Sequence, residues 1–246
     1  MKPVEHKISH HYQPTVTSCG YAALATLLSH YGRVIGIEDL LKQVPQSTDE
    51  KGNSIGSLTA QLAEWTISQG FEVDFTTFDF IITDLSWIGL DSEQLVERLE
   101  KVKHVRNVHN VGGKYWSEMY VQAYINLINS GGKLSVVPHV TTELLYEKLQ
   151  HAPIYVNICP AVVYGKGRQR YIDTDELNKD SSVDDDLNGE VGTHSVIIYG
   201  NNDKGNFLIS DPWEGLAVVD PEAIICGITA AVIECDSQLF QIQANN

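Results

Sequence analysis

Four side chains of this sequence are of types that together could break an amide bond: Gln13, Cys19, His194 and Asp211. Cys19 stands where a polar segment gives way to an apolar run, 21–30, that is rich in alanine and leucine and lacks proline. Such a run predicts a buried helix that begins near Cys19. Unpaired amides and the helix dipole stabilise a thiolate there, and the thiolate is the nucleophilic form of cysteine. A small core residue is the alternative for Cys19, and position alone leaves both open.

His194 and Asp211 stand at the ends of two neighbouring apolar runs. His194 begins the run at 193–199, and Asp211 follows the run at 206–210, with turn residues between them. This pattern predicts a hairpin that brings the two side chains onto adjacent strands. A carboxylate beside an imidazole can fix its tautomer and stabilise its charged form. An aspartate before proline is otherwise a common turn residue.

Gln13 lies in the polar segment before Cys19. A side-chain amide next to a nucleophile can donate a hydrogen bond to the oxyanion of a tetrahedral intermediate, together with the amide of the nucleophile itself. A single glutamine in a loop is most often a surface residue. Gln13 therefore counts as a candidate only in combination with Cys19 and His194.

Three segments, taken in order, resemble the bacteriocin-processing, double-glycine peptidases of the papain-like superfamily. The resemblance implies an oxyanion-binding Gln13, a nucleophilic Cys19, a basic His194 and an orienting Asp211, with no cofactor and no metal. It also implies a free-standing member of the family, because no transporter segment is present. The matching stretches are Gln13 with Ser-Cys-Gly-Tyr-Ala-Ala at 18–23, Gly-Thr-His-Ser-Val-Ile-Ile-Tyr-Gly at 192–200, and Leu-Ile-Ser-Asp-Pro-Trp-Glu-Gly at 208–215.

The order of predicted elements agrees with an α+β class. Helices dominate the first half of the chain and strands the second, including an expected last strand at 228–234. We expect one domain over 1–246 with a papain-like fold, in which a buried N-terminal helix carrying the cysteine packs on an antiparallel sheet carrying the histidine and the aspartate. Two stretches are expected to account for the length of this chain beyond that of the compact members of the family: a helical insertion around 78–132 and an acidic loop around 165–192.

The charge and composition of the chain limit the classes of partner that we expect. The formal net charge of −15, from 32 acidic and 17 basic residues, repels phosphate backbones, so nucleic acid is not expected. A peptide or protein substrate is expected, and the acidic surface could favour a basic one, although solubility is the commoner explanation. No stretch reaches the roughly 18 apolar residues that span a bilayer. Residues 1–11 lack the apolar core of a secretory signal, which predicts a cytoplasmic protein.

Other functions fit some of the same residues. The Cys–His–Asp set could serve hydrolysis, acyl transfer (transpeptidation) or glutamine deamidation, since only the acceptor or the scissile bond differs. A catalytically silent peptide-binding module on the same fold is a further alternative. A metal-dependent hydrolase would use the histidines at 6, 10 and 11, but no carboxylates stand at ligand spacing beside them, so we expect no metal.

The remaining cysteines are weaker candidates. Cys159 lies at the end of an apolar run and is expected to be a core thiol, with a reserve role as nucleophile. Cys226 and Cys235 flank the expected last strand and are interpreted as structural. An acidic loop directly before His194 could act as a lid or as a recognition surface for a basic peptide.

Overall fold

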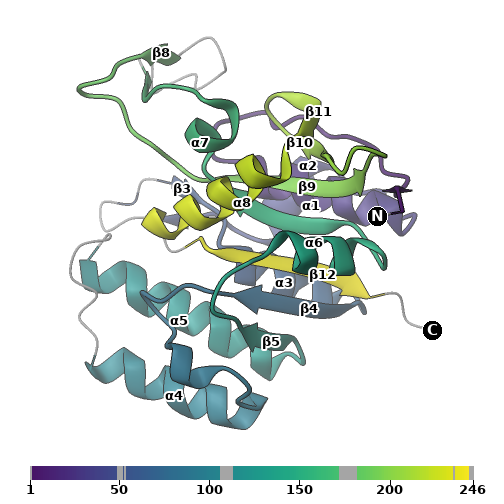
Figure 1. Ribbon diagram of the computed structural model, residues 1–246. Coiled ribbons are helices and arrows are strands. Elements are labelled where there is room, and N and C mark those ends of the chain that lie inside the picture. The colour runs from purple at the N-terminus through teal and green to yellow at the C-terminus, as the bar shows by residue number, and fades with distance from the viewer. Residues whose placement is uncertain are drawn as a thin grey trace.

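A central mixed sheet organises the chain (Figure 1). The computed structural model describes residues 2–48, 52, 54–105, 113–171, 182–234 and 236–243. Within these residues the sheet has eight strands, and every pair is antiparallel except β4 with β5. Its order is β11 (Gly215–Val219), β10 (Phe207–Asp211), β9 (His194–Asn201), β6 (Ile154–Ile158), β12 (Gln238–Gln243), β4 (Glu72–Thr77) and β5 (Lys133–Val136), with β1 (Val4–Glu5) pairing to β9.

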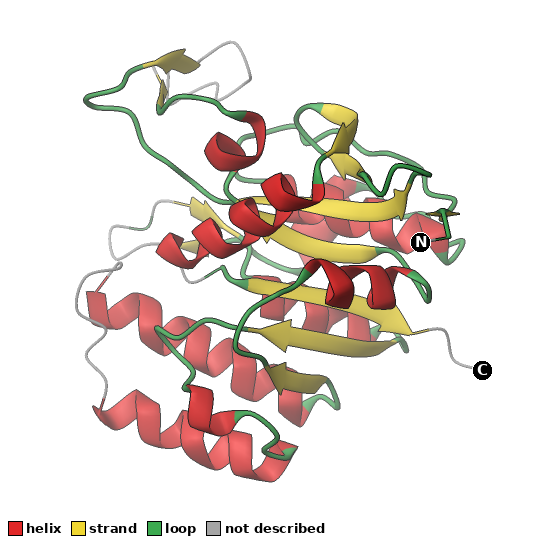
Figure 2. Cartoon of the chain, viewed as in Figure 1, coloured by secondary structure: helices red, strands yellow, loops and turns green. Residues whose placement is uncertain are grey.

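Helices cover both faces of this sheet (Figure 2). The two sides hold separate buried clusters of apolar side chains. Strand β9 contributes side chains to both clusters. Ile197 and Tyr199 belong to one cluster and Val196 and Ile198 to the other, because successive side chains of a strand point to opposite faces of the sheet. One face carries α1 (Cys19–His30), α2 (Ile37–Gln43), α3 (Thr59–Ser68), α4 (Ser92–Val105) and α5 (Gly113–Asn129), and the other α6 (Thr142–Leu149), α7 (Pro160–Tyr164) and α8 (Pro221–Ala230).

Helix α1 is the central helix of the first face. Its residues from Gly20 to Leu28 are all buried, and it contacts β9, β6 and β10. Alanine and leucine favour the helix, and each fully buried leucine stabilises the fold by about 2 kcal/mol. The prediction of an α+β fold with a buried cysteine-bearing helix on a mainly antiparallel sheet is therefore confirmed.

The expected strand at 228–234 is wrong. These residues form the end of α8 and a short 3-10 helix, η3 (Ala231–Glu234), and the last strand is β12. The β-branched composition favoured a strand, but the local start signal was stronger. Asp220 caps the helix by accepting a hydrogen bond from the Glu222 amide, and Pro221 occupies its first turn.

The two segments expected to lengthen the chain contain regular structure. The expected helical insertion at 78–132 holds η1 (Leu85–Trp87), α4 and α5. The expected acidic loop at 165–192 contains a two-stranded sheet of β7 (Gln169–Tyr171) and β8 (Ser182–Asp184), while 172–181 lie outside the described residues. A further small sheet pairs β2 (Ser47–Thr48) with β3 (Ser54–Gly56). No helix in the described ranges is long and apolar enough to cross a membrane.

Candidate active site

Cys19 is the first residue of α1, and the loop before it is held by Ser18. The Ser18 hydroxyl accepts a hydrogen bond from the Thr15 amide at 3.0 Å and donates to the Thr15 carbonyl at 2.8 Å. Ser18 therefore does not cap the helix with its side chain. The first-turn amides of an α-helix have no partner within the helix, and they stabilise an anion bound next to them.

Gly20 allows α1 to approach its neighbours closely. A Cβ atom at this position would lie 2.2 Å from Ser57 Oγ and 3.0 Å from both Leu62 Cδ1 and Tyr155 Oη. Any larger residue would displace at least the Ser57 side chain and crowd those of Leu62 and Tyr155. The glycine next to Cys19 thus leaves room for the side chains packed around the start of α1.

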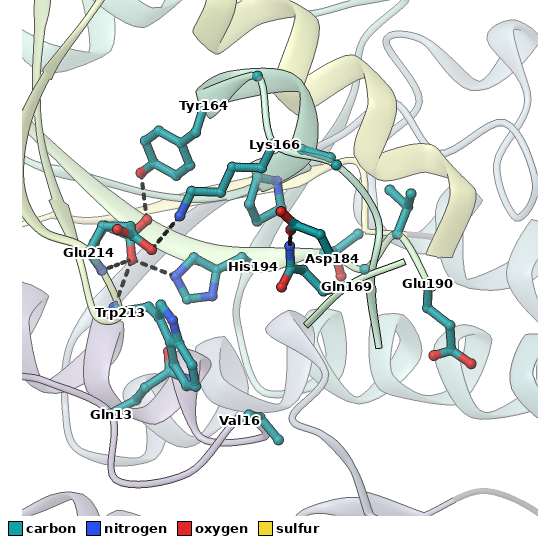
Figure 3. Close-up of a pocket in the computed structure, with 18 residues that line it drawn as sticks. Gln13, Val16, Tyr164, Lys166, Gln169, Asp184, Glu190, His194, Trp213 and Glu214 are labelled. Carbon is teal, nitrogen blue, oxygen red and sulfur yellow. Dashed lines mark hydrogen bonds and ion pairs between the residues drawn. The ribbon is translucent and has the colours of Figure 1, made fainter. Parts of the chain in front are cut away.

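His194 begins β9 and interacts with both Cys19 and Asp211. Figure 3 shows it beside Gln13, Trp213 and Tyr164. Its Nε2 atom donates to Asp211 Oδ1 at 2.7 Å, which leaves Nδ1 for its interaction with the Cys19 side chain. The structure therefore brings Cys19, His194 and Asp211 together. They come from the start of α1, the start of β9 and the end of β10.

The Asp211 carboxylate is fully buried and extensively hydrogen-bonded. Besides His194, Oδ1 accepts from the amides of Trp213 at 2.7 Å and Glu214 at 3.0 Å. Oδ2 accepts from the Tyr164 hydroxyl at 2.5 Å. These bonds fix the carboxylate, and through it the plane of the imidazole. Tyr164 ends α7 and was missed in the sequence, where nothing links it to Asp211.

The electrostatics of the three residues favour a charged pair. Burial alone would raise the pKa of the Cys19 thiol, but the hydrogen bond and charge of His194 outweigh it, so the pKa lies below its ordinary value. Burial alone would lower the pKa of His194, but Asp211 and Cys19 together raise it to about 10. Burial likewise opposes the Asp211 charge, yet His194 holds the pKa of that carboxyl well below its usual range. Near neutral pH these shifts favour a thiolate beside an imidazolium.

Gln13 lies at the same site. Its backbone amide donates to the Pro212 carbonyl at 3.0 Å, which ties its loop to the turn after Asp211. Its side-chain Nε2 donates to the Thr15 carbonyl at 2.8 Å, and Gln13 lines one cavity with His194. An amide nitrogen carries two hydrogens, so one remains for an oxyanion.

A buried polar network lies behind the thiol and was also missed. The Cys19 sulfur is 4.0 Å from the Ser195 hydroxyl, which accepts from Tyr155 Oη at 2.7 Å and donates to Asn157 Oδ1 at 2.9 Å. Asn157 in turn donates to Thr59 Oγ1 at 2.7 Å. A polar Asn157 inside the apolar run of β6 is the signal that could have revealed this network, because buried polar groups need partners.

The cavity beside His194 has a volume of about 640 Å³ and mixed walls. Gln13, Tyr164 and Trp213 form part of it, and the β7–β8 hairpin forms another part. Lys166 is neutralised by Glu214 at 2.6 Å, whereas the carboxylates of Asp184 and Glu190 add negative charge to the lining. The cavity is large enough for part of a peptide or a small molecule.

The other residues considered in the sequence lie elsewhere. Cys159 is buried as the N-cap of α7, Cys226 is exposed on α8, and Cys235 lies outside the described residues. His6 Nε2 bonds the Leu149 carbonyl at 2.7 Å, and His10 Nδ1 bonds Ser210 Oγ at 2.7 Å. In the described part of the chain, no group of three or more histidine, cysteine, aspartate or glutamate side chains has metal-site geometry.

Comparisons with known proteins give structural neighbours but no sequence match. No family model and no curated protein matches the chain. A C39-like peptidase from Bacillus anthracis superposes over all of both chains with 10% identity and a TM-score of 0.49. A double glycine motif protease from an AMS/PCAT transporter, in complex with a leader peptide, covers 100% of this chain and 99% of its own, with 12% identity and a TM-score of 0.45.

Proposed function

We propose that this protein is a cysteine hydrolase that cleaves peptide or amide bonds through an acyl-enzyme, with Cys19 as nucleophile. The observation that carries the proposal is the placement of Cys19 at the start of α1, close enough to His194 for the two side chains to interact electrostatically, with His194 hydrogen-bonded to Asp211 and lining an open cavity. A nucleophile, a base within hydrogen-bond reach and a third group that orients the base are what covalent catalysis by a thiol requires.

The geometry gives each residue a role. The Cys19 thiolate attacks the substrate carbonyl carbon, and the negative charge moves to the carbonyl oxygen. The Cys19 amide at the start of α1 and the remaining hydrogen of Gln13 Nε2 stabilise that oxyanion. The His194 imidazolium donates its Nδ1 proton to the leaving amine, and the bond to that amine breaks. Neutral His194 then takes a proton from water, which attacks the thioester and releases the acid.

A peptide or protein segment is the proposed substrate. The negative charge that Asp184 and Glu190 add to the cavity wall favours segments with lysine or arginine near the scissile bond. The same acyl-enzyme could be resolved by an amine, which gives transpeptidation, and attack on a glutamine side chain would give deamidation. Water is the simplest acceptor, so hydrolysis is the activity we expect.

Product analysis by mass spectrometry on a mixed peptide library tests this proposal. The wild-type protein and a Cys226→Ala variant, which lacks only the exposed thiol of α8, should both produce new peptide termini. A Cys19→Ala variant should produce none. Intact peptides with glutamine converted to glutamate would instead show deamidation, and joined peptides would show transfer. Peptide binding without any change of mass would identify a catalytically silent module and contradict the proposal.

A further inference from the structure

Thr193, the residue directly before His194, is held between two acidic side chains. Its backbone amide donates to Glu234 Oε2 at 2.9 Å. Its Oγ1 atom lies 2.7 Å from the same Glu234 oxygen and 2.5 Å from Asp236 Oδ2. Glu234 ends η3 and Asp236 lies just before β12, so the contact ties the start of β9 to a distant part of the chain.

A count of hydrogens shows that this arrangement needs a proton. The Thr193 hydroxyl has a single hydrogen and can donate to only one of the two carboxyl groups. If it donates to Glu234, the contact at 2.5 Å with Asp236 has no hydrogen between the oxygens unless Asp236 is protonated. If it donates to Asp236, the contact at 2.7 Å with Glu234 has no hydrogen between the oxygens unless Glu234 is protonated. The observed geometry is therefore satisfied when the pair carries one proton.

The surroundings favour retention of that proton. Burial is the largest cause that raises the pKa of Asp236, to about 7, with the charges of Glu234 and Asp79 acting in the same direction. Hydrogen bonds from Thr193 and Tyr120 act in the opposite direction. The titratable groups facing Asp236 are thus Glu234 from η3, Asp79 from the segment after β4, Tyr120 from α5 and Tyr155 from β6.

Tyr120 connects Glu234 and Asp236 to helix α5. Its hydroxyl lies 3.0 Å from the Glu234 carbonyl oxygen and 3.2 Å from Asp236 Oδ1, and its single hydrogen can be donated to either of them. Helix α5, which carries Tyr120, is packed against α4 and α3. Helix α5 therefore contacts the Glu234 backbone and the Asp236 side chain, and both acidic side chains hold Thr193.

We propose that Glu234 and Asp236 share one proton and, through Thr193, position His194 against Cys19. Loss of that proton places two negative charges around one hydroxyl, and their repulsion releases Thr193 and loosens the start of β9. The positioning role rests on the proposed function, whereas the shared proton does not. Thr193, Glu234 and Asp236 are positioning residues, because none of them touches the reacting thiol.

The pH profile distinguishes this device from the titration of His194 itself. Because the pKa of His194 is raised to about 10, an activity limited only by its imidazolium would persist to alkaline pH. Control by the acidic pair instead predicts that kcat/KM falls as pH rises through about 7, where Asp236 loses its proton. An Asp236→Asn variant replaces the shared proton by a permanent N–H donor. It should keep activity and move the alkaline limb of kcat/KM toward about 10, the pKa of His194.

Stability provides a test that does not depend on activity. The Asp236 pKa is higher in the folded protein than its ordinary value of 3.8, so the folded state binds the proton more tightly. Its contribution is fully present below 3.8 and is lost as pH rises to about 7, so Tm should fall over this range. Asp236→Asn should flatten that fall. Asp203→Asn, the same change at an exposed turn between β9 and β10, should leave it as in the wild type.

Thr193 variants test whether the pair acts on His194. Thr193→Val removes the hydroxyl and should slow alkylation of Cys19 by iodoacetamide at neutral pH at least tenfold, whereas Thr193→Ser should restore the wild-type rate. An unchanged slope of Tm against pH in Asp236→Asn would overturn the shared proton. Equal alkylation rates in Thr193→Val and the wild type would overturn the positioning role. Both measurements remain valid if no hydrolysis is found, so the two proposals fail separately.

Discussion

Replacement of Cys19 by alanine is expected to lower kcat/KM for peptide hydrolysis by about 10⁴-fold or more, because the covalent route is lost completely. Serine at this position should be almost as inactive. Its hydroxyl does not ionise near neutral pH, so no anionic nucleophile forms beside His194. Alanine is a good helix former and fits the start of α1, so the fold should remain.

The Cys19→Ala measurement needs a matched thiol control and a check of the fold. Cys226→Ala removes a thiol from the exposed face of α8 and should leave kcat/KM unchanged. Circular dichroism and Tm of both variants should match the wild type within a few degrees. Retention of more than a tenth of the activity by Cys19→Ala would show that another group carries the reaction.

Replacement of Asp211 by alanine is expected to lower kcat by about 10²- to 10⁴-fold, which is the usual contribution of a positioned acid–base pair. The substitution leaves the Nε2 proton of His194 and the amides of Trp213 and Glu214 without their buried acceptor. The imidazole then loses both its orientation and the charge that raises its pKa.

An Asp211→Asn variant separates orientation from charge. The amide oxygen can still accept from His194, Trp213 and Glu214, and the Tyr164 hydroxyl can accept from the amide nitrogen instead of donating. This variant should therefore lose less activity than Asp211→Ala. Because the charge of Asp211 is gone, the pKa of His194 should fall, and in an Asp236→Asn background, where His194 sets the alkaline limb, that limb should move to lower pH. Equal kcat values and pH profiles in both variants and the wild type would remove Asp211 from the mechanism.

The sequence predicted the parts of the site that depend on local signals. Cys19 was placed at the start of a buried helix because a polar segment there precedes an apolar run without proline, and α1 begins at this residue. His194 and Asp211 were expected on paired strands because turn residues separate two short apolar runs. Strands β9 and β10 do pair, and the side chains of His194 and Asp211 are hydrogen-bonded to each other.

The parts that were missed depend on contacts between distant segments. Tyr164 reaches Asp211 from α7, and Asn157 reaches Ser195 because β6 pairs with β9 in one particular register. A change of register by one residue would turn these side chains to the other face of the sheet. No local pattern specifies that register. The strand predicted at 228–234 is wrong for a different reason. Its β-branched residues favour a strand, but the helix that starts at the Asp220 cap continues into this segment.

The most direct test of the central claim is the rate of Cys19 alkylation by iodoacetamide as a function of pH, with peptide mapping, in the wild type and in His194→Ala. An ordinary thiol with a pKa of about 8.5 reacts slowly at pH 6, because little thiolate is present. The thiolate–imidazolium pair predicts rapid labelling of Cys19 at pH 6. His194→Ala should shift the profile to alkaline pH, because burial then raises the pKa of the thiol without opposition from the imidazolium. Slow labelling at pH 6 in the wild type, with a profile that His194→Ala leaves unchanged, would contradict the catalytic pair and leave a thiol that takes no part in chemistry.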